Sequence, residues 1–215
     1  MNNSYLKIAD HYKQTFDKHG ATPQGLDWDN QENLEKRYKV MQDLYRDIDQ
    51  FYGFTLLDFG CGYGGFYNWL DKQQGTHHIQ YTGLDINENA INKAKELYPE
   101  INFFQSNIHR NTFDADQFDM LKWDYIICNG TFTIKNSLTQ EEMTNFICST
   151  LEKLWTKTNK GIAFNCMSKI LDYERDDLFH VSFDELSRWV YDNLSSKFSI
   201  RQDYGLREFT MYVYK

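Results

Sequence analysis

The 215-residue sequence has little of what marks several large classes of protein. It contains only two prolines, and no apolar run approaches the ~20 residues that a membrane span needs. Its four cysteines (Cys61, Cys128, Cys148 and Cys166) form no CxxC pair and have no histidine nearby at ligand spacing. We therefore expect no zinc site, no disulfide framework and no membrane segment, and a cytoplasmic protein with reduced cysteines.

Clustered positive charge is also missing. The chain has 23 Lys and Arg against 31 Asp and Glu, which gives a net charge of −8 at pH 7, and its basic residues are scattered. Phosphate backbones are bound by clustered Lys and Arg, so the composition disfavours a nucleic-acid partner. The length allows one sizeable α/β domain. We expect one structural unit, in which residues 1–50 form a helical cap with a lid loop (residues 19–28) over a core of residues 51–215.

The most informative stretch is residues 54–65, FTLLDFGCGYGG, where an apolar run ends in an acid and breaks into alternating glycines. The first four residues are too few for a helix and too apolar for an edge strand, which predicts a central strand of a parallel sheet. Gly60, Gly62 and Gly64 let the backbone turn sharply and approach a ligand where a Cβ would clash. The stretch therefore predicts a nucleotide-binding turn.

A second acid, Asp85, ends the next apolar stretch, residues 81–85. The segment between the two stretches has helical spacing and completes a strand–helix–strand unit of roughly 30 residues. Asp85 should therefore lie at the carboxyl end of the neighbouring strand, where a carboxylate can accept hydrogen bonds from ribose hydroxyls. The glycine pattern alone fits either a dinucleotide or S-adenosylmethionine (SAM).

Residues 57–64, LDFGCGYG, resemble the first motif of the class I SAM-dependent methyltransferases. The acid two residues before the first glycine and the cysteine between the first two glycines are typical of that family. A carboxylate at Asp58 would face a pyrophosphate in a dinucleotide site, whereas SAM brings a cationic amine and a sulfonium. The resemblance implies that SAM is the cofactor and that these residues help to bind it: Asp58, Gly60, Cys61, Gly62, Asp85 and Ile86.

The rest of the chain predicts an α/β fold with a seven-stranded Rossmann-like sheet, an antiparallel C-terminal hairpin and an N-terminal helical cap. Helices are expected over residues 4–16, 30–49, 87–98, 143–155 and about 182–194, with a charged insertion at 168–180. Further strands are expected over residues 101–105, 123–130, 161–167, 198–204 and 208–214. An antiparallel pair that closes a parallel sheet is the class I methyltransferase arrangement.

The same resemblance implies further cofactor contacts. The family usually has a small residue and an acid after the third strand; this chain has Asn107, followed by Ile108, and the amide oxygen of Asn107 can still accept from the adenine amine. Asn129 and Gly130 end the fourth strand, where the chain passes beneath the methyl group. Tyr12 and Arg37 are candidates for reaching the methionine end, although a core Tyr and a solvated Arg are the alternatives.

Methyl transfer is an in-line displacement that depends mainly on positioning, and a hydroxyl acceptor would also need a base. His19 in the lid loop and Tyr12 are candidate catalytic residues, and His109 lies near the same cleft; a structural role is the commoner alternative for each histidine. The residues expected to border the substrate are His19, Trp28, Phe132, His180 and Tyr204. No cluster resembles the metal site of catechol-type methyltransferases, so no metal is expected.

We therefore predict an enzyme that transfers a methyl group from SAM to oxygen or nitrogen of a small polar metabolite. Residues 19–28 and 203–210 also resemble a group of small bacterial methyltransferases that are associated with surface-glycan or specialised metabolism. The alternatives are an RNA or protein methyltransferase, a non-catalytic SAM-binding subunit, and a nucleotide-dependent oxidoreductase. The oligomeric state is not predicted.

Overall fold

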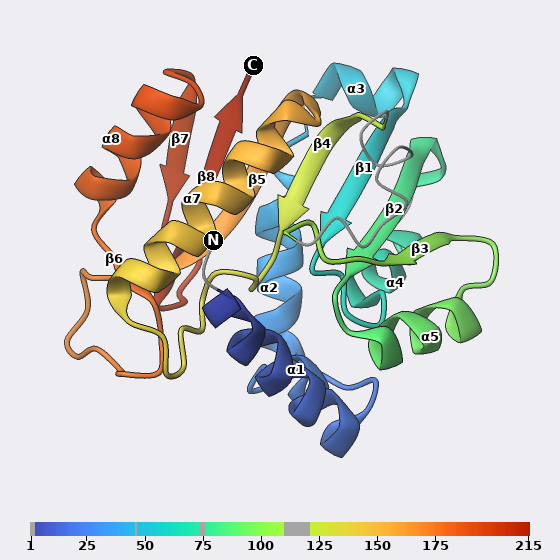
Figure 1. Ribbon diagram of the computed structural model, residues 1–215. Coiled ribbons are helices and arrows are strands. Elements are labelled where there is room, and N and C mark those ends of the chain that lie inside the picture. The colour runs from blue at the N-terminus through green and yellow to red at the C-terminus, as the bar shows by residue number, and fades with distance from the viewer. Residues whose placement is uncertain (1–2, 46, 74–75, 110–120) are drawn as a thin grey trace.

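The computed structural model describes residues 3–45, 47–73, 76–109 and 121–215. Within these ranges an eight-stranded sheet has the order β3-β2-β1-β4-β5-β8-β7, with β6 paired to β5 (Figure 1). The strands are β1 (Phe54–Phe59), β2 (Ile79–Asp85), β3 (Asn102–Gln105), β4 (Trp123–Cys128), β5 (Thr158–Ser168), β6 (His180–Val181), β7 (Phe198–Arg201) and β8 (Glu208–Tyr214). Strand β8 runs antiparallel to β5 and β7, which confirms the predicted sheet and its C-terminal hairpin.

Helices lie on both faces of the sheet (Figure 1). They are α1 (Leu6–His19), α2 (Gln31–Gln42), α3 (Asp47–Tyr52), α4 (Gly65–Asp71), α5 (Glu88–Leu97), α7 (Gln140–Thr156) and α8 (Phe183–Asn193), with short 3-10 turns at Asn3–Tyr5, Gln24–Leu26 and Thr76–His78. Helices α5 and α7 begin where side chains cap them: Asn87 accepts from two backbone N–H groups, and Thr139 forms a capping box with Glu142. No helix in the described ranges is long and apolar enough to cross a membrane.

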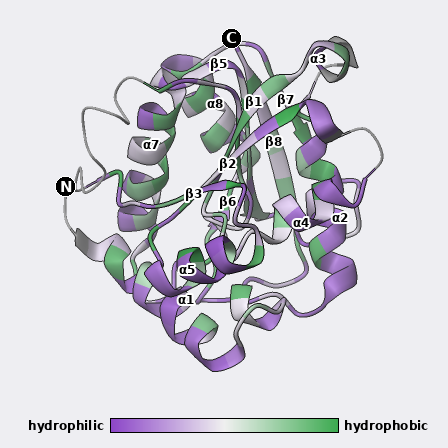
Figure 2. Cartoon of the chain, turned by 90° about the vertical axis from the view of Figure 1, so that its right-hand side faces the viewer, coloured by the Kyte–Doolittle hydropathy of each residue, from purple (hydrophilic) through white to green (hydrophobic). Residues whose placement is uncertain are grey.

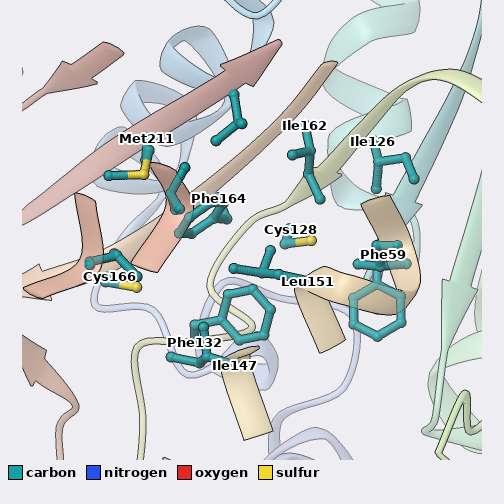
Figure 3. Close-up of a cluster of buried hydrophobic side chains, with 14 of the residues drawn as sticks. Phe59, Ile126, Cys128, Phe132, Ile147, Leu151, Ile162, Phe164, Cys166 and Met211 are labelled. Atoms are coloured by element: carbon teal, nitrogen blue, oxygen red, sulfur yellow. The ribbon is translucent and has the colours of Figure 1, made fainter. Parts of the chain in front are cut away.

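Two apolar layers hold the helices to the sheet. One contains residues of α7 and α8 with one face of β1, β4, β5 and β8, including Phe132, Ile147 and Phe164 (Figure 3). The other joins α2, α4 and α5 to the opposite face, for example through Leu34, Phe66 and Ile91. The helices around the sheet alternate hydrophilic and hydrophobic residues, as amphipathic helices do (Figure 2).

The single helix predicted over residues 30–49 was wrong. Asn30 caps α2 as expected, because its side chain accepts from the N–H of Asn33, but α2 ends at Gln42 and α3 begins at Asp47. Leu44 and Tyr45 lie between the two helices and are still buried. Apolar spacing therefore continues through a break in the helix, and spacing alone could not detect it.

Candidate functional site

The carboxyl ends of β1, β2 and β4 point toward α1 (Figure 1). The glycine turn follows β1 at this edge of the sheet and leads into α4. Gly60, Gly62 and Gly64 have positive φ of 81°, 55° and 82°, a region that favours glycine. A Cβ on Gly62 would lie 2.4 Å from Leu26 Cδ2, and one on Gly60 would lie 2.6 Å from Thr131 Oγ1. The sharp turn was predicted from the glycine pattern, and it packs directly against the lid loop and the segment after β4; its approach to a ligand stays a prediction.

Asp85, at the end of β2, fixes the shape of this turn. Its Oδ2 accepts from the N–H of Gly62 at 2.8 Å, and its Oδ1 accepts from the N–H of Asn87 at 2.7 Å. Burial raises the pKa of Asp85, and the backbone N–H groups of Asn87, Gly62 and Ile86 oppose that shift. One carboxylate therefore both organises the glycine turn and lines the adjoining cavity.

Asp58, near the end of β1, is 2% exposed and lines the same cavity. The hydroxyl of Tyr81 donates to its Oδ2 at 2.5 Å. The pKa of Asp58 is raised to about 7: burial raises it most, the nearby Asp85 also raises it, and the hydrogen bond from Tyr81 opposes the shift. Among the described residues neither Asp58 nor Asp85 forms an ion pair, so this end of the cavity favours a cationic ligand.

The structure brings most of the predicted cofactor residues to one cavity. They are Tyr12, Asp58, Gly60, Cys61, Gly62, Asp85, Ile86, Asn107, Ile108, Asn129 and Gly130, and Trp28 from the predicted substrate set joins them. The wall of this cavity also contains residues from helices. Helix α1 adds Tyr5 from just before its start together with Ile8, Ala9 and Phe16, and α7 adds Phe146.

Sequence reasoning missed those α1 and α7 residues. Helical spacing predicted α1 as a lid or flank, but it could not tell which residues of the helix face the cavity. The ring of Phe146 stacks on Tyr5 at 5.5 Å between centroids, so the two segments meet at the cavity wall. The pairing joins residues far apart in the chain, and no local signal in the sequence marks it.

Asn107 already has protein partners. Its side-chain oxygen accepts from the hydroxyl of Tyr5 at 3.0 Å and from the N–H of His109 at 3.1 Å. A carbonyl oxygen has two lone pairs, and both are engaged here. The predicted contact between this oxygen and the adenine amine would require one of these bonds to be released.

Tyr12 reaches the segment after β4. Its hydroxyl donates to the carbonyl of Gly130 at 3.1 Å, and burial raises the pKa of Tyr12 well above its usual range. Such a phenol stays protonated at neutral pH and acts as a donor. The geometry therefore favours positioning over base catalysis for this candidate.

Arg37 does not line the cavity. Its Nε and Nη2 donate to Glu208 Oε2 at 3.0 and 2.9 Å, and its guanidinium carbon lies 3.9 Å from the centroid of the Trp28 ring. Glu208 is 1% exposed and also accepts from Asn165 Nδ2 at 2.9 Å. Asn165 Oδ1 in turn accepts from the N–H of Gly130 at 2.7 Å. This Arg37–Glu208–Asn165 network connects the lid loop to the segment after β4.

Four predicted substrate residues also lie away from the cavity wall. Phe132 is fully buried in the core against Phe146 and Phe164, because the chain after β4 turns inward. His19 is exposed and borders a separate depression. Tyr204 is hydrogen-bonded to Thr210 Oγ1 at 3.0 Å.

His180 has a structural environment. Its Nδ1 donates to the carbonyl of Ser168 at 2.8 Å, and its Nε2 accepts from the N–H of Arg175 at 3.2 Å. Both ring nitrogens therefore form hydrogen bonds with backbone groups at the end of β5 and in the segment between β5 and β6. The charged composition of residues 168–180 suggested a surface loop, but pairing of β6 with β5 buries this histidine.

Within the described ranges, three residues that line the cavity each have a buried polar atom without a hydrogen-bond partner. These atoms are Ser106 Oγ, His109 Nδ1 and Asn129 Oδ1. Buried polar groups are normally paired, so these three atoms are exceptions among the residues of the wall.

Residues 57–146 match the family model of a methyltransferase domain. The "Putative methyltransferase Rv1506c" of Mycobacterium tuberculosis is 28% identical over 164 residues, which cover 75% of this chain and 93% of that protein. The phthiotriol/phenolphthiotriol dimycocerosates methyltransferase of the same species is 31% identical over 71 residues, 32% of this chain and 26% of that one. These matches indicate a methyltransferase domain, and its fold is that of the class I SAM-dependent methyltransferases.

Solved methyltransferase structures share the fold. Magnesium protoporphyrin IX methyltransferase from Synechocystis PCC 6803, with bound S-adenosylhomocysteine (SAH), superposes with a TM-score of 0.68 at 14% identity, over 99% of this chain and 100% of that chain. The plantazolicin methyltransferase BpumL, also with SAH, gives 0.59 at 14% identity, over 100% and 91%. The cofactor of this methyltransferase is SAM, and its cavity fits that ligand: a glycine turn gives close approach, and two carboxylates offer negative charge.

Proposed function

We propose that the methyltransferase acts on oxygen or nitrogen of a small polar metabolite. In this arrangement Asp85 accepts from the ribose hydroxyls of the cofactor and Asp58 faces its methionine ammonium. SAM supplies an electrophilic methyl group when bound. The protein contributes binding, orientation and removal of the acceptor's proton.

A polar depression beside Trp28 is the observation that carries this proposal. Trp28 borders both the cavity and the depression, and a Cβ on Gly130 would lie 2.3 Å from the Trp28 ring. The depression is lined by residues of α1 and the lid loop: His11, Gln14, Thr15, Lys18, His19, Gln24, Asp27 and Asp29. Side chains of both signs beside the segment after β4 suit a small polar acceptor better than an apolar or polyanionic one.

Within the depression, His11 Nε2 lies 2.9 Å from Asp27 Oδ2. A carboxylate in this position favours the tautomer that carries its proton on Nε2, which leaves the Nδ1 lone pair as an acceptor. Nδ1 would take the proton from an acceptor hydroxyl or amine as the methyl group forms its new bond to oxygen or nitrogen. His11, rather than His19, is therefore our candidate base.

The test uses SAM with a labelled methyl group, offered to pooled polar metabolites, bulk RNA and a protein extract. We expect label in the small-molecule fraction. Label confined to RNA or to protein would refute the proposed substrate class. With the acceptor so identified, His11→Asn should lower kcat by about 100-fold with SAM affinity unchanged. The matched control is His77→Asn, which alters an exposed histidine outside both the cavity and the depression.

A further inference from the structure

The ring of Trp28 and the backbone of Gly130 meet where the cavity adjoins the polar depression. Trp28 lines both the cavity and the depression, and Gly130 lines the cavity. The two are in close contact, because a Cβ on Gly130 would lie 2.3 Å from Trp28 Cζ2. With the acceptor in the depression, as in the proposed function on which this step rests, the acceptor atom meets the methyl group beside this contact.

Arg37 holds the ring of Trp28 in place. Its guanidinium carbon lies 3.9 Å from the centroid of the ring, so the cation lies over the aromatic face. The guanidinium is itself fixed, because its Nε and Nη2 donate to Glu208 Oε2 at 3.0 and 2.9 Å. Its Nη1 also donates to the carbonyl of Asn33 at 3.1 Å. The position of the Trp28 ring therefore depends on Glu208.

Asn165 holds the backbone of Gly130, and Glu208 sets the orientation of the Asn165 amide. Asn165 Nδ2 donates to Glu208 Oε1 at 2.9 Å, and Asn165 Oδ1 accepts from the N–H of Gly130 at 2.7 Å. A carboxylate only accepts, so the amide must turn its nitrogen to Glu208 and its oxygen to Gly130. The hydroxyl of Tyr204, 3.5 Å from Glu208 Oε1, can donate or accept and imposes no direction. One carboxylate thus fixes the direction of the bonds that lead to Gly130.

Glu208 and Asn165 act on the site from outside it. They are 1% and 0% exposed, and neither is among the described residues that line the cavity or the depression. Replacing such a buried network by apolar side chains often costs no stability. A buried polar network whose members are all paired instead fixes one arrangement of the groups that it contacts. Here those groups are the ring of Trp28 and the peptide of Gly130.

We propose that Glu208 is a positioning residue for methyl transfer. Through Arg37 it holds the ring of Trp28. Through Asn165 it holds the peptide of Gly130. These two connections meet at the boundary between cofactor and acceptor, so their common carboxylate keeps the acceptor in line with the methyl group. In-line displacement is sensitive to small errors of placement, and this demand is separate from that of stability.

An exchange of the amide and the carboxylate separates this role from space filling. In Glu208→Gln the new amide turns its oxygen to Arg37 and its nitrogen to Asn165 Nδ2, donor against donor, so either that contact or the bond from Gly130 is lost. In Asn165→Asp two carboxylates face each other. In the double variant Glu208→Gln/Asn165→Asp the amide at position 208 donates to the carboxylate at position 165, which still accepts from Gly130. The double variant also keeps the net charge, and all three variants are close in shape to the wild type.

Fluorine NMR of protein labelled with 5-fluorotryptophan reports on the ring of Trp28, with SAH as the ligand. The chain has five tryptophans, and Trp28→Phe identifies the resonance. We expect a sharp Trp28 resonance in the wild type, displacement or broadening in each single variant, and a return toward the wild-type spectrum in the double variant, without and with SAH. The control is Asp49→Asn, which alters another buried acid, bonded to Lys160 and Tyr125 outside the cavity and the depression. It should leave the Trp28 resonance unchanged.

The labelled-SAM assay adds a measurement of catalysis once its acceptor is known. Each single variant should lose about 10- to 100-fold in kcat/KM for the acceptor, and the double variant should recover most of that loss. The affinity for SAH in calorimetry should change much less, because the charged groups proposed to hold the cofactor, Asp58 and Asp85, are untouched. A merely structural role would lower both quantities together and would not predict recovery in the double variant.

Wild-type Trp28 spectra in both single variants would overturn the proposal, as would a double variant no closer to the wild type than either single one. If the single variants do not fold, Arg37→Lys provides the test. It keeps a positive charge beside Glu208 but removes the planar cation over the ring, so the Trp28 resonance should move. An unchanged resonance there would also overturn the proposal. A screen that finds no small polar acceptor would instead refute the proposed function and leave the fluorine result standing.

Discussion

The buried acids of this methyltransferase differ in whether a basic side chain pairs with them: Glu208 has such a partner, and Asp58 and Asp85 have none among the described residues. Glu208 on β8 is paired with Arg37 and bonded to Asn165, so its charge is compensated within the protein. In the part of the chain that the structure describes, Asp58 and Asp85, at the ends of β1 and β2, receive only hydroxyl and backbone N–H donors. A buried charge without a counter-ion is costly, and a cationic ligand would relieve that cost. The comparison separates an acid that supports the fold from acids positioned for the cofactor.

The largest effect should come from breaking the compensated pair. Glu208→Ala leaves the guanidinium of Arg37 without its partner, so we expect the free energy of unfolding to fall by about 3 to 5 kcal/mol in chemical denaturation. Lys36→Ala, which removes the exposed Glu32–Lys36 pair, is the control and should cost less than about 1 kcal/mol. Equal effects for the two variants would show that burial of the Arg37–Glu208 pair does not matter.

Gly130→Ala should have the next largest effect, because Gly130 ends the Arg37–Glu208–Asn165 network. Its φ is +79°, and a Cβ would lie 2.3 Å from the ring of Trp28. Strain and overpacking together should destabilise the protein by about 2 to 4 kcal/mol. Gly205 has φ of +72° but nothing within 4 Å of its Cβ position, so Gly205→Ala should cost only about 1 kcal/mol in thermal unfolding. If the two variants lost the same stability, the positive φ alone would explain the effect, and the contact with Trp28 would contribute nothing.

Asp58→Asn should move stability in the opposite direction from Glu208→Ala. The pKa of Asp58 is raised in the folded state to about 7, so the native state binds an extra proton between about pH 4 and 7 and wild-type stability falls as pH rises through that window. At pH 8 the variant, without SAM, should be more stable by about 2 to 4 kcal/mol, and the gain should vanish near pH 4.

The same variant should bind SAM more weakly, since it lacks the carboxylate that faces the ammonium. Thermal unfolding across pH measures the first effect and calorimetry the second. If the variant were destabilised at pH 8, or bound SAM as tightly as the wild type, Asp58 would not be an acid positioned for a cationic ligand.

The smallest effect on stability is expected at Tyr12. Its hydroxyl connects helix α1 to the segment after β4 by donating to the carbonyl of Gly130. Tyr12→Phe removes one hydrogen bond without changing the ring, so the loss should be about 1 kcal/mol in denaturant unfolding. Because Thr133 Oγ1 also donates to that carbonyl, at 3.0 Å, the oxygen stays paired. A loss above about 3 kcal/mol would show that Tyr12 has a larger part in the network than one hydrogen bond.

The sequence predicted the fold well where local chemistry determines structure. Alternating glycines after a buried strand, the cap at Asn87 and the C-terminal hairpin all depend on short stretches of chain. The prediction of one helix over residues 30–49 failed because Leu44 and Tyr45 remain buried where the helix is broken. Local spacing reports burial, which here continues after the helical hydrogen bonds end.

The site was predictable only in part for the same reason. Asp58 and Asp85 follow strands, so parallel topology places them together. The pairings of Arg37 with Glu208 and of Tyr5 with Phe146 join residues more than 100 positions apart, and His180 is buried by a two-residue strand too short to predict. The contacts of the predicted cofactor residues with SAM remain predictions that the experiments above address.

The position of α1 has a consequence for turnover. Tyr5, Ile8, Ala9, Tyr12 and Phe16 all face the cavity, so this helix forms one of its walls. For SAH to leave on this side after methyl transfer, the helix must first move away from the rest of the protein. Product departure past α1 would then require breaking the contacts of Tyr5 with Asn107 and of Tyr12 with Gly130, and the pace of that opening would set an upper limit on the catalytic cycle.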